Sequence, residues 1–113
     1  MSPALRSLLQ RAPGAGDLAG ADVRIGRAEH PVCGDEVEVS IRVQAGRITE
    51  LAWRARGCPA SVAVAAAAHE ALRDVEVGAA GAKLTAHVDA LGGLGQAERH
   101  ALNLVLTALA AAR

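Results

Sequence analysis

The stretch Val37-Glu38-Val39-Ser40-Ile41-Arg42-Val43 has the clearest pattern in the chain, because apolar and polar residues alternate strictly along it. This two-residue period predicts a β-strand with one buried face and one face in solvent. After the turn Gln44–Arg47 the alternation resumes, with Leu51, Trp53 and Ala55 on one face. We therefore expect an antiparallel β-hairpin in which Trp53 is the main core anchor.

Helical periodicity flanks this hairpin on both sides. Residues 3–10 carry apolar side chains at helical spacing, and they follow Ser2, a residue type that caps helix N-termini. The segment 23–25 alternates in hydrophobicity, so a further strand can begin there. After the hairpin, apolar spacing predicts helices over residues 60–73, 83–91 and 96–112, with a linker over 74–81. The pattern indicates an α+β fold with an antiparallel sheet packed against helices.

Length and composition limit the number of domains and exclude several classes of function. The 113 residues include 12 Lys and Arg, 12 Asp and Glu, and one aromatic residue, Trp53, and we expect one domain over residues 1–113. Nucleic-acid binding is not expected, because that function needs excess positive charge and aromatic platforms. No apolar stretch reaches the ~18 residues of a membrane span, and no signal-peptide pattern is present, so we expect a cytoplasmic protein.

Two cysteines flank the predicted hairpin. Cys33 and Asp35 lie just before its first strand, and Cys58 follows its second strand, so the hairpin brings these potential metal ligands to one edge of the sheet. Cys58 also precedes a predicted helix, whose N-terminus favours a thiolate. The alternative is that each cysteine is a small buried apolar residue. A disulfide between them is geometrically possible but rare in the cytosol.

The four histidines differ in their predicted surroundings. His69 and His87 lie inside predicted helices and are expected on structural or solvated faces. His30 lies in the loop that carries Cys33, so it is a candidate for supporting the metal ligands. His100 lies near the start of the last predicted helix, and periodicity alone places it on the surface.

The order of these motifs resembles that of the iron–sulfur cluster assembly scaffold family, which includes IscU, SufU and the N-terminal domain of NifU. The matching segments are HPVCGD at residues 30–35, RGCPAS at 56–61, LGGL at 91–94 and ERH at 98–100. The resemblance covers nearly the whole chain. It implies a small three-stranded antiparallel sheet packed against helices.

The resemblance also implies a set of ligands for iron, a transient [2Fe–2S] cluster or zinc, namely Cys33, Asp35, Cys58 and His100. The family's third cysteine falls on Ala101, and sliding the match by one position places Leu102 there. Iron–sulfur clusters are mostly held by thiolates, with histidine as an occasional ligand. Two sulfurs, one nitrogen and one oxygen also suit tetrahedral zinc.

The function implied by the resemblance is that of an iron–sulfur cluster assembly scaffold or sulfur acceptor, and not of an enzyme. A cysteine desulfurase would deliver persulfide sulfur to Cys33 or Cys58, and apo iron–sulfur proteins would receive the cluster. Zinc-dependent sulfur transfer is the one enzymatic variant of this role. The alternative, favoured by Ala101, is a structural zinc protein or a degenerate paralogue that acts as an interaction module without assembling a cluster.

Overall fold

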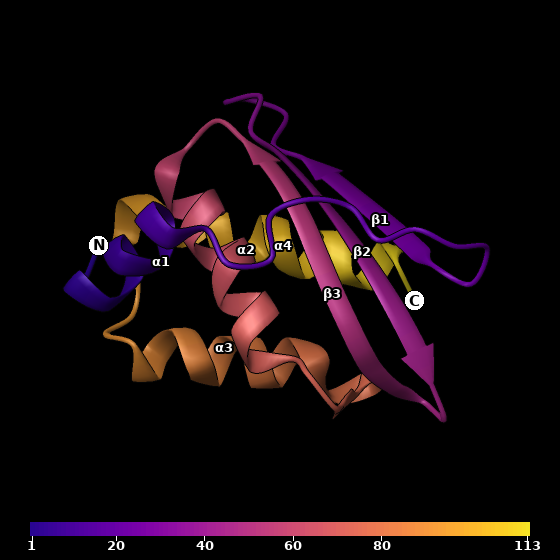
Figure 1. The fold of residues 1–113 in the computed structure, drawn as a ribbon. Helices are drawn as coiled ribbons and strands as arrows, with labels where there is room; N and C mark the ends of the chain where they lie inside the picture. The colour runs from indigo at the N-terminus through magenta and orange to yellow at the C-terminus, as the bar shows by residue number, and fades with distance from the viewer.

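A four-stranded antiparallel sheet carries four α-helices on one face (Figure 1). The computed structural model describes residues 1–113. The strands pair in the order β1 Arg24–Glu29, β2 Glu36–Gln44, β3 Arg47–Arg56 and β4 Val75–Glu76. The helices are α1 Pro3–Arg11, α2 Pro59–Ala71, α3 Ala80–Ala90 and α4 Arg99–Ala111; short 3-10 turns, Val77–Ala79 and Gln96–Glu98, precede α3 and α4. The predicted α+β class is confirmed.

The strand count differs from the prediction, because the sheet has four strands and not three. The fourth strand, β4, has two residues and pairs with the start of β3, where Ile48 lies opposite Val75. It falls in the segment 74–81, for which the sequence predicts a linker. Two residues show no alternation, so periodicity cannot detect such a strand.

The predicted hairpin is confirmed and forms the centre of the sheet. Strands β2 and β3 are antiparallel, and Val39 lies opposite Trp53. A two-residue turn joins them, and both of its residues have positive φ, 52° at Ala45 and 76° at Gly46. This backbone conformation matches the right-handed twist of the paired strands, so the turn fixes their register.

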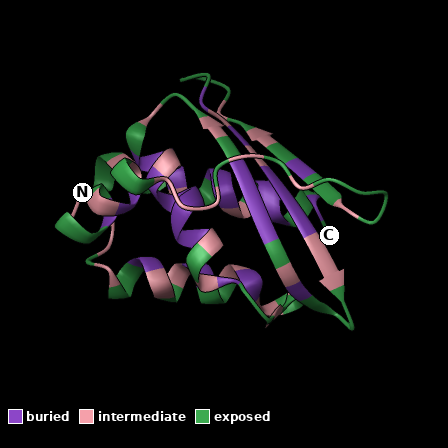
Figure 2. Ribbon diagram, viewed as in Figure 1, coloured by how far each residue is buried: buried purple, intermediate pink, exposed green.

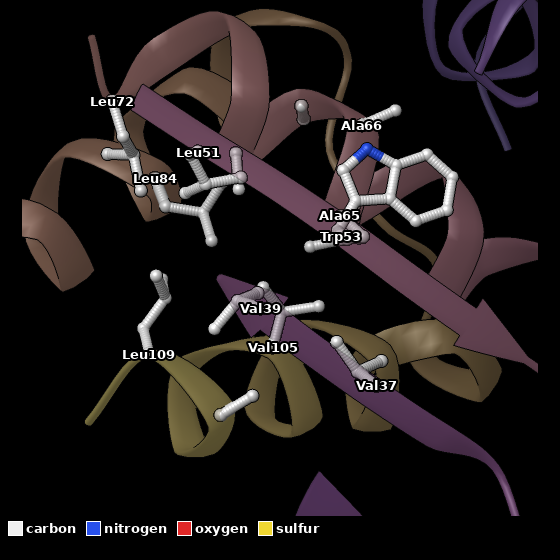
Figure 3. Close-up of a cluster of buried hydrophobic side chains, with 14 of the residues drawn as sticks. Val37, Val39, Leu51, Trp53, Ala65, Ala66, Leu72, Leu84, Val105 and Leu109 are labelled. Carbon is white, nitrogen blue, oxygen red and sulfur yellow. The ribbon is translucent and has the colours of Figure 1, made fainter. Parts of the chain in front are cut away.

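The helices form two layers against the sheet. Helix α2 packs on β3 and α4 packs on β1 and β2, while α1 and α3 cover α2 from outside. The run Ala63–Ala68 is fully buried, which lets α2 lie close to its neighbours. Buried residues accordingly line α2 and the helix-facing side of the sheet (Figure 2). Trp53 is 4% exposed among valines, leucines and alanines, as predicted (Figure 3).

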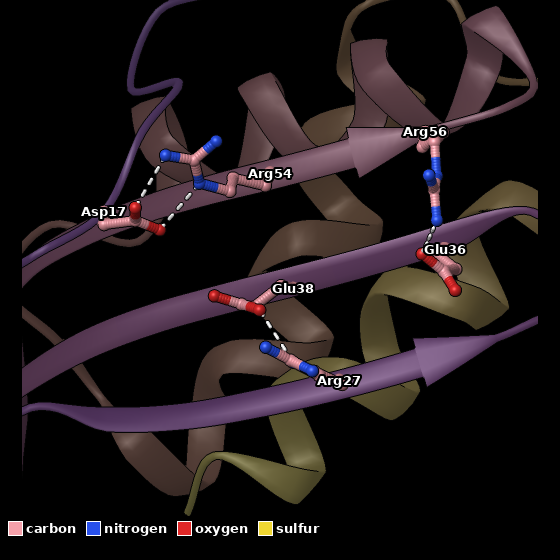
Figure 4. A network of polar contacts seen from close by, with 6 residues as sticks. All are labelled: Asp17, Arg27, Glu36, Glu38, Arg54 and Arg56. Atoms are coloured by element: carbon pink, nitrogen blue, oxygen red, sulfur yellow. Dashed lines mark hydrogen bonds and ion pairs between the residues drawn. The ribbon is translucent and has the colours of Figure 1, made fainter.

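The outer face of the sheet is polar and is crossed by the chain that follows α1. Ala15 bridges to Trp53 at the edge of β3, and the indole Nε1 of Trp53 donates a hydrogen bond of 2.7 Å to the Pro13 carbonyl. Asp17 accepts two hydrogen bonds from Arg54, which lower the pKa of Asp17 below its usual value. Further ion pairs cover the same face (Figure 4).

None of the helices combines the length and the apolar character that crossing a membrane requires.

Candidate metal centre

Three side chains with metal-binding atoms meet where β2 begins and β3 ends. They are those of Asp35, Cys58 and His100, and their ligand atoms all lie within 4.8 Å of one another. Nε2 of His100 is 3.3 Å from Oδ2 of Asp35, a distance that also permits a weak hydrogen bond. Nitrogen and oxygen ligands about 2.0 Å from a tetrahedral zinc ion lie about 3.3 Å apart. The spacing of the Asp35 and His100 ligand atoms therefore fits one metal ion.

The Asp35 carboxylate is buried and has one oxygen free for a metal. Its residue is 4% exposed, and Oδ1 accepts a hydrogen bond of 3.1 Å from the Cys58 backbone N–H. Oδ2 is directed toward His100. The carboxylate is thus fixed at one oxygen and available for monodentate ligation through the other.

Gly57 allows the Asp35 carboxylate to lie this close to the backbone at Cys58. Its φ is +112°, a conformation that residues with a side chain rarely adopt. A Cβ at position 57 would lie only 2.2 Å from Oδ1 of Asp35. In the sequence, Gly57 is recognisable only as the residue before Cys58. Its contact with Asp35 joins two segments that are distant in the sequence, so no local sequence pattern predicts it.

Cys58 occupies the N-cap position of α2, followed by Pro59 in the first turn. Its residue is half-buried, and its side chain makes no capping hydrogen bond, so the sulfur remains available to a ligand. In the same turn the Ser61 hydroxyl is fully buried and has no hydrogen-bond partner.

His100 is the second residue of α4, and its side chain is 25% exposed. Periodicity alone places it on the surface, whereas the structure directs its ring toward the buried Asp35. The next residue, Ala101, is fully buried and has no metal-binding atom. Helix α4 thus contributes an imidazole to the site and no thiolate.

Cys33 lies outside this three-residue group. It is exposed in the loop between β1 and β2, beside Val32, which is 87% exposed. The structure therefore brings together three of the four residues that the resemblance implies, and it leaves the Cys33 thiol on an adjacent exposed loop. The loop is ordered by His30, which also contacts His100.

The two remaining histidines do not belong to the group. His87 is half-buried beside Glu70, with 3.3 Å between Nε2 and the carboxylate. His69 is also half-buried, and its Nδ1 lies 2.7 Å from the Leu51 carbonyl. Since a carbonyl only accepts hydrogen bonds, His69 carries a proton on Nδ1 and has a structural role between α2 and β3.

The fold and the site together define a small α+β domain that presents a thiol, a carboxylate and an imidazole at one end of its sheet. A family model described as the NifU-like N terminal domain matches residues 10–113. The chain belongs to this family, as its motifs indicated.

Two curated relatives from Archaeoglobus fulgidus are named iron–sulfur cluster assembly scaffold proteins IscU 1 and IscU 2. Each is 34% identical to this chain over 96 residues, which cover 83% of the chain and 61% of the relative. The chain thus spans less than two thirds of the length of these relatives.

Solved structures share the fold. A NifU-like N-terminal protein from Brucella abortus aligns with a TM-score of 0.72 at 16% identity, over 96% of this chain and 88% of that one. A protein described as an iron–sulfur cluster assembly scaffold for the SUF system of Fervidobacterium islandicum aligns with a TM-score of 0.66 at 16% identity, over 91% of this chain and 79% of that one.

Proposed function

We propose that this protein is an iron–sulfur cluster assembly scaffold or sulfur acceptor that binds its cargo through Cys33, Asp35, Cys58 and His100. The observation that carries the proposal is the convergence of Asp35, Cys58 and His100 within 4.8 Å. Family membership and the names of the curated relatives support the same role. Cys33, on the adjacent loop, supplies the second thiolate.

The four donors divide into two kinds. The thiolates of Cys33 and Cys58 are soft ligands that suit iron–sulfur clusters and zinc. The Asp35 carboxylate is harder and exchanges more readily from soft metals, which suits a site that must release its cargo. His100 occupies the remaining position, because histidine can replace cysteine as a cluster ligand.

The exposed thiol of Cys33 is suited to receive sulfur from a cysteine desulfurase. Its thiolate attacks the terminal sulfur of the enzyme's cysteine persulfide, so that a new sulfur–sulfur bond forms at Cys33. The bond within the enzyme persulfide breaks, and the desulfurase cysteine leaves as a thiolate. Cys58 is the second candidate acceptor, but it is half-buried.

Anaerobic reconstitution of tag-free protein with ferrous iron and sulfide tests the scaffold function. The expected product is coloured, with acid-labile sulfide bound in proportion to protein and visible absorption typical of a cluster. Asp35→Ala, Cys58→Ala and His100→Ala are each expected to lose most of this absorption. His87→Ala is the matched control, since His87 lies outside the group. A colourless wild-type product without bound sulfide would contradict cluster assembly.

A second candidate is a zinc-binding protein that does not assemble a cluster, and the buried Ala101 favours it. Without a third cysteine, the four donors match the mixed ligand sets of tetrahedral zinc. Metal analysis of protein purified without a metal-affinity tag distinguishes the candidates. One tightly held zinc per chain, lost in Cys58→Ala and not displaced by iron and sulfide, would favour the zinc protein.

A further inference from the structure

The loop that carries Cys33 is organised around one residue, His30. The backbone N–H groups of Val32 and Cys33 lie 3.3 and 3.1 Å from Nδ1 of the His30 ring, and both donate to it. The Gly34 N–H donates to the His30 carbonyl at 2.9 Å, and the His30 N–H donates to the Asp35 carbonyl at 2.8 Å. Three successive N–H groups of the loop therefore point to His30.

The same ring also contacts His100, one of the three residues of the metal centre. The His30 and His100 rings are 5.4 Å apart between centroids, with an interplanar angle of 72°, an edge-to-face contact. His30 thus touches the backbone of Cys33, the backbone of Asp35 and the ring of His100. His30 thereby links the loop between β1 and β2 to helix α4, two segments that are far apart in the sequence.

We propose that His30 is a positioning residue that holds the Cys33 loop against the metal centre. Nδ1 fixes the backbone at Val32 and Cys33, and the ring restrains His100 beside it. Because Nδ1 accepts two hydrogen bonds, it carries no proton, and the proton of the neutral ring lies on Nε2. The inference rests on the proposed metal centre, in which Cys33 is the fourth ligand. Groups that orient metal ligands typically contribute about 10- to 100-fold to metal affinity.

Three variants test separately the two contacts of His30, the hydrogen bonds that Nδ1 accepts from the loop and the ring contact with His100. His30→Ala removes both of them. His30→Asn keeps the acceptor, because the Asn Oδ1 is bonded to Cγ just as Nδ1 is in histidine, and Asn side chains commonly accept from N–H groups that follow them. His30→Phe keeps a ring against His100 but has no acceptor. His87→Ala, away from the site, is the control for loss of a histidine.

The affinity for Zn²⁺ is measured by competition with a chromophoric chelator, and thermal unfolding of the metal-free variants reports on folding. His30→Ala and His30→Phe are expected to bind Zn²⁺ about tenfold more weakly or worse, while His30→Asn stays within about threefold of wild type. Alkylation of Cys33, followed by peptide mass spectrometry, is expected to be slowed by Zn²⁺ in wild type and His30→Asn but not in His30→Ala.

Several results would overturn the proposal. One is wild-type Zn²⁺ affinity and full protection of Cys33 in His30→Ala; another is an Asn variant that is as weak as the Ala variant. Nitrogen-15 NMR of the metal-free protein gives a test that does not depend on metal, since it shows which ring nitrogen of His30 is protonated. A proton on Nδ1 refutes the loop contact. If the wild type binds no Zn²⁺, the proposed metal centre fails while this NMR result still decides the contact.

Discussion

Gly57→Ala is the substitution whose effect follows most directly from the geometry of the site. Gly57 has a φ of +112°, and a Cβ there would lie 2.2 Å from Oδ1 of Asp35. The backbone strain alone costs about 1–3 kcal/mol. Displacing the carboxylate also breaks its hydrogen bond with the Cys58 N–H, and leaving a buried group unpaired costs about 1–3 kcal/mol more.

A loss of at least about 2 kcal/mol is therefore expected, which lowers the melting temperature of a domain of this size by about 8 °C or more. The affinity for Zn²⁺ is expected to fall with it, because Asp35 can no longer present Oδ2 to the metal. Circular dichroism measures the melting temperature, and chelator competition measures the affinity.

Gly16→Ala is the matched control, since Gly16 has a φ of +134° but no atom lies within 4 Å of the place that a Cβ would take. It shares the backbone strain without the clash, and Gly16 is not one of the metal-binding residues. The reasoning is refuted if Gly57→Ala melts no lower than Gly16→Ala and binds Zn²⁺ as tightly as wild type.

Three further predictions concern residues around and outside the centre. Ser61→Ala is expected to leave the melting temperature unchanged or to raise it, because the buried hydroxyl has no partner to lose; a clear decrease in thermal unfolding experiments would contradict this. Ala101→Cys is expected to increase the cluster yield on reconstitution by adding a third thiolate, with Leu102→Cys as the neighbouring control; no gain would argue against the family alignment at this position. Arg54→Ala is expected to destabilise the fold at neutral pH. Arg54 lowers the pKa of Asp17 in the folded state, so its contribution is present above the usual Asp range and is lost as the pH falls through the lowered pKa. Melting curves of both proteins should therefore converge at acid pH, and a constant difference would contradict this origin.

Local sequence patterns predict those parts of the molecule that depend on neighbouring residues. The alternation in residues 37–43 predicts β2 because the apolar face of that strand, at Val37, Val39 and Ile41, is buried. The polar face is partly exposed except at Ser40, which is also buried. The Ser2 cap is also local, and its hydroxyl accepts a hydrogen bond from the Leu5 N–H. By contrast, β4 is too short to show a period.

The site depends on contacts between distant segments, which periodicity does not record. Helical spacing gives His100 no role, because its partner Asp35 lies 65 positions earlier in the chain. Family resemblance supplies this pairing where the local pattern does not. The contact of His30 with His100 and the fit of Gly57 against Asp35 become visible only once the fold places these segments together.

X-ray absorption spectroscopy of the zinc-loaded protein at the zinc edge tests the metal centre most directly, because it reports the number and type of ligand atoms. The expected coordination shell has two sulfur atoms at about 2.3 Å and two nitrogen or oxygen atoms at about 2.0 Å. Cys33→Ala and Cys58→Ala should each remove one sulfur. A shell without sulfur, or a wild-type shell that is unchanged in His100→Ala and Asp35→Ala, would contradict a centre built from Cys33, Asp35, Cys58 and His100.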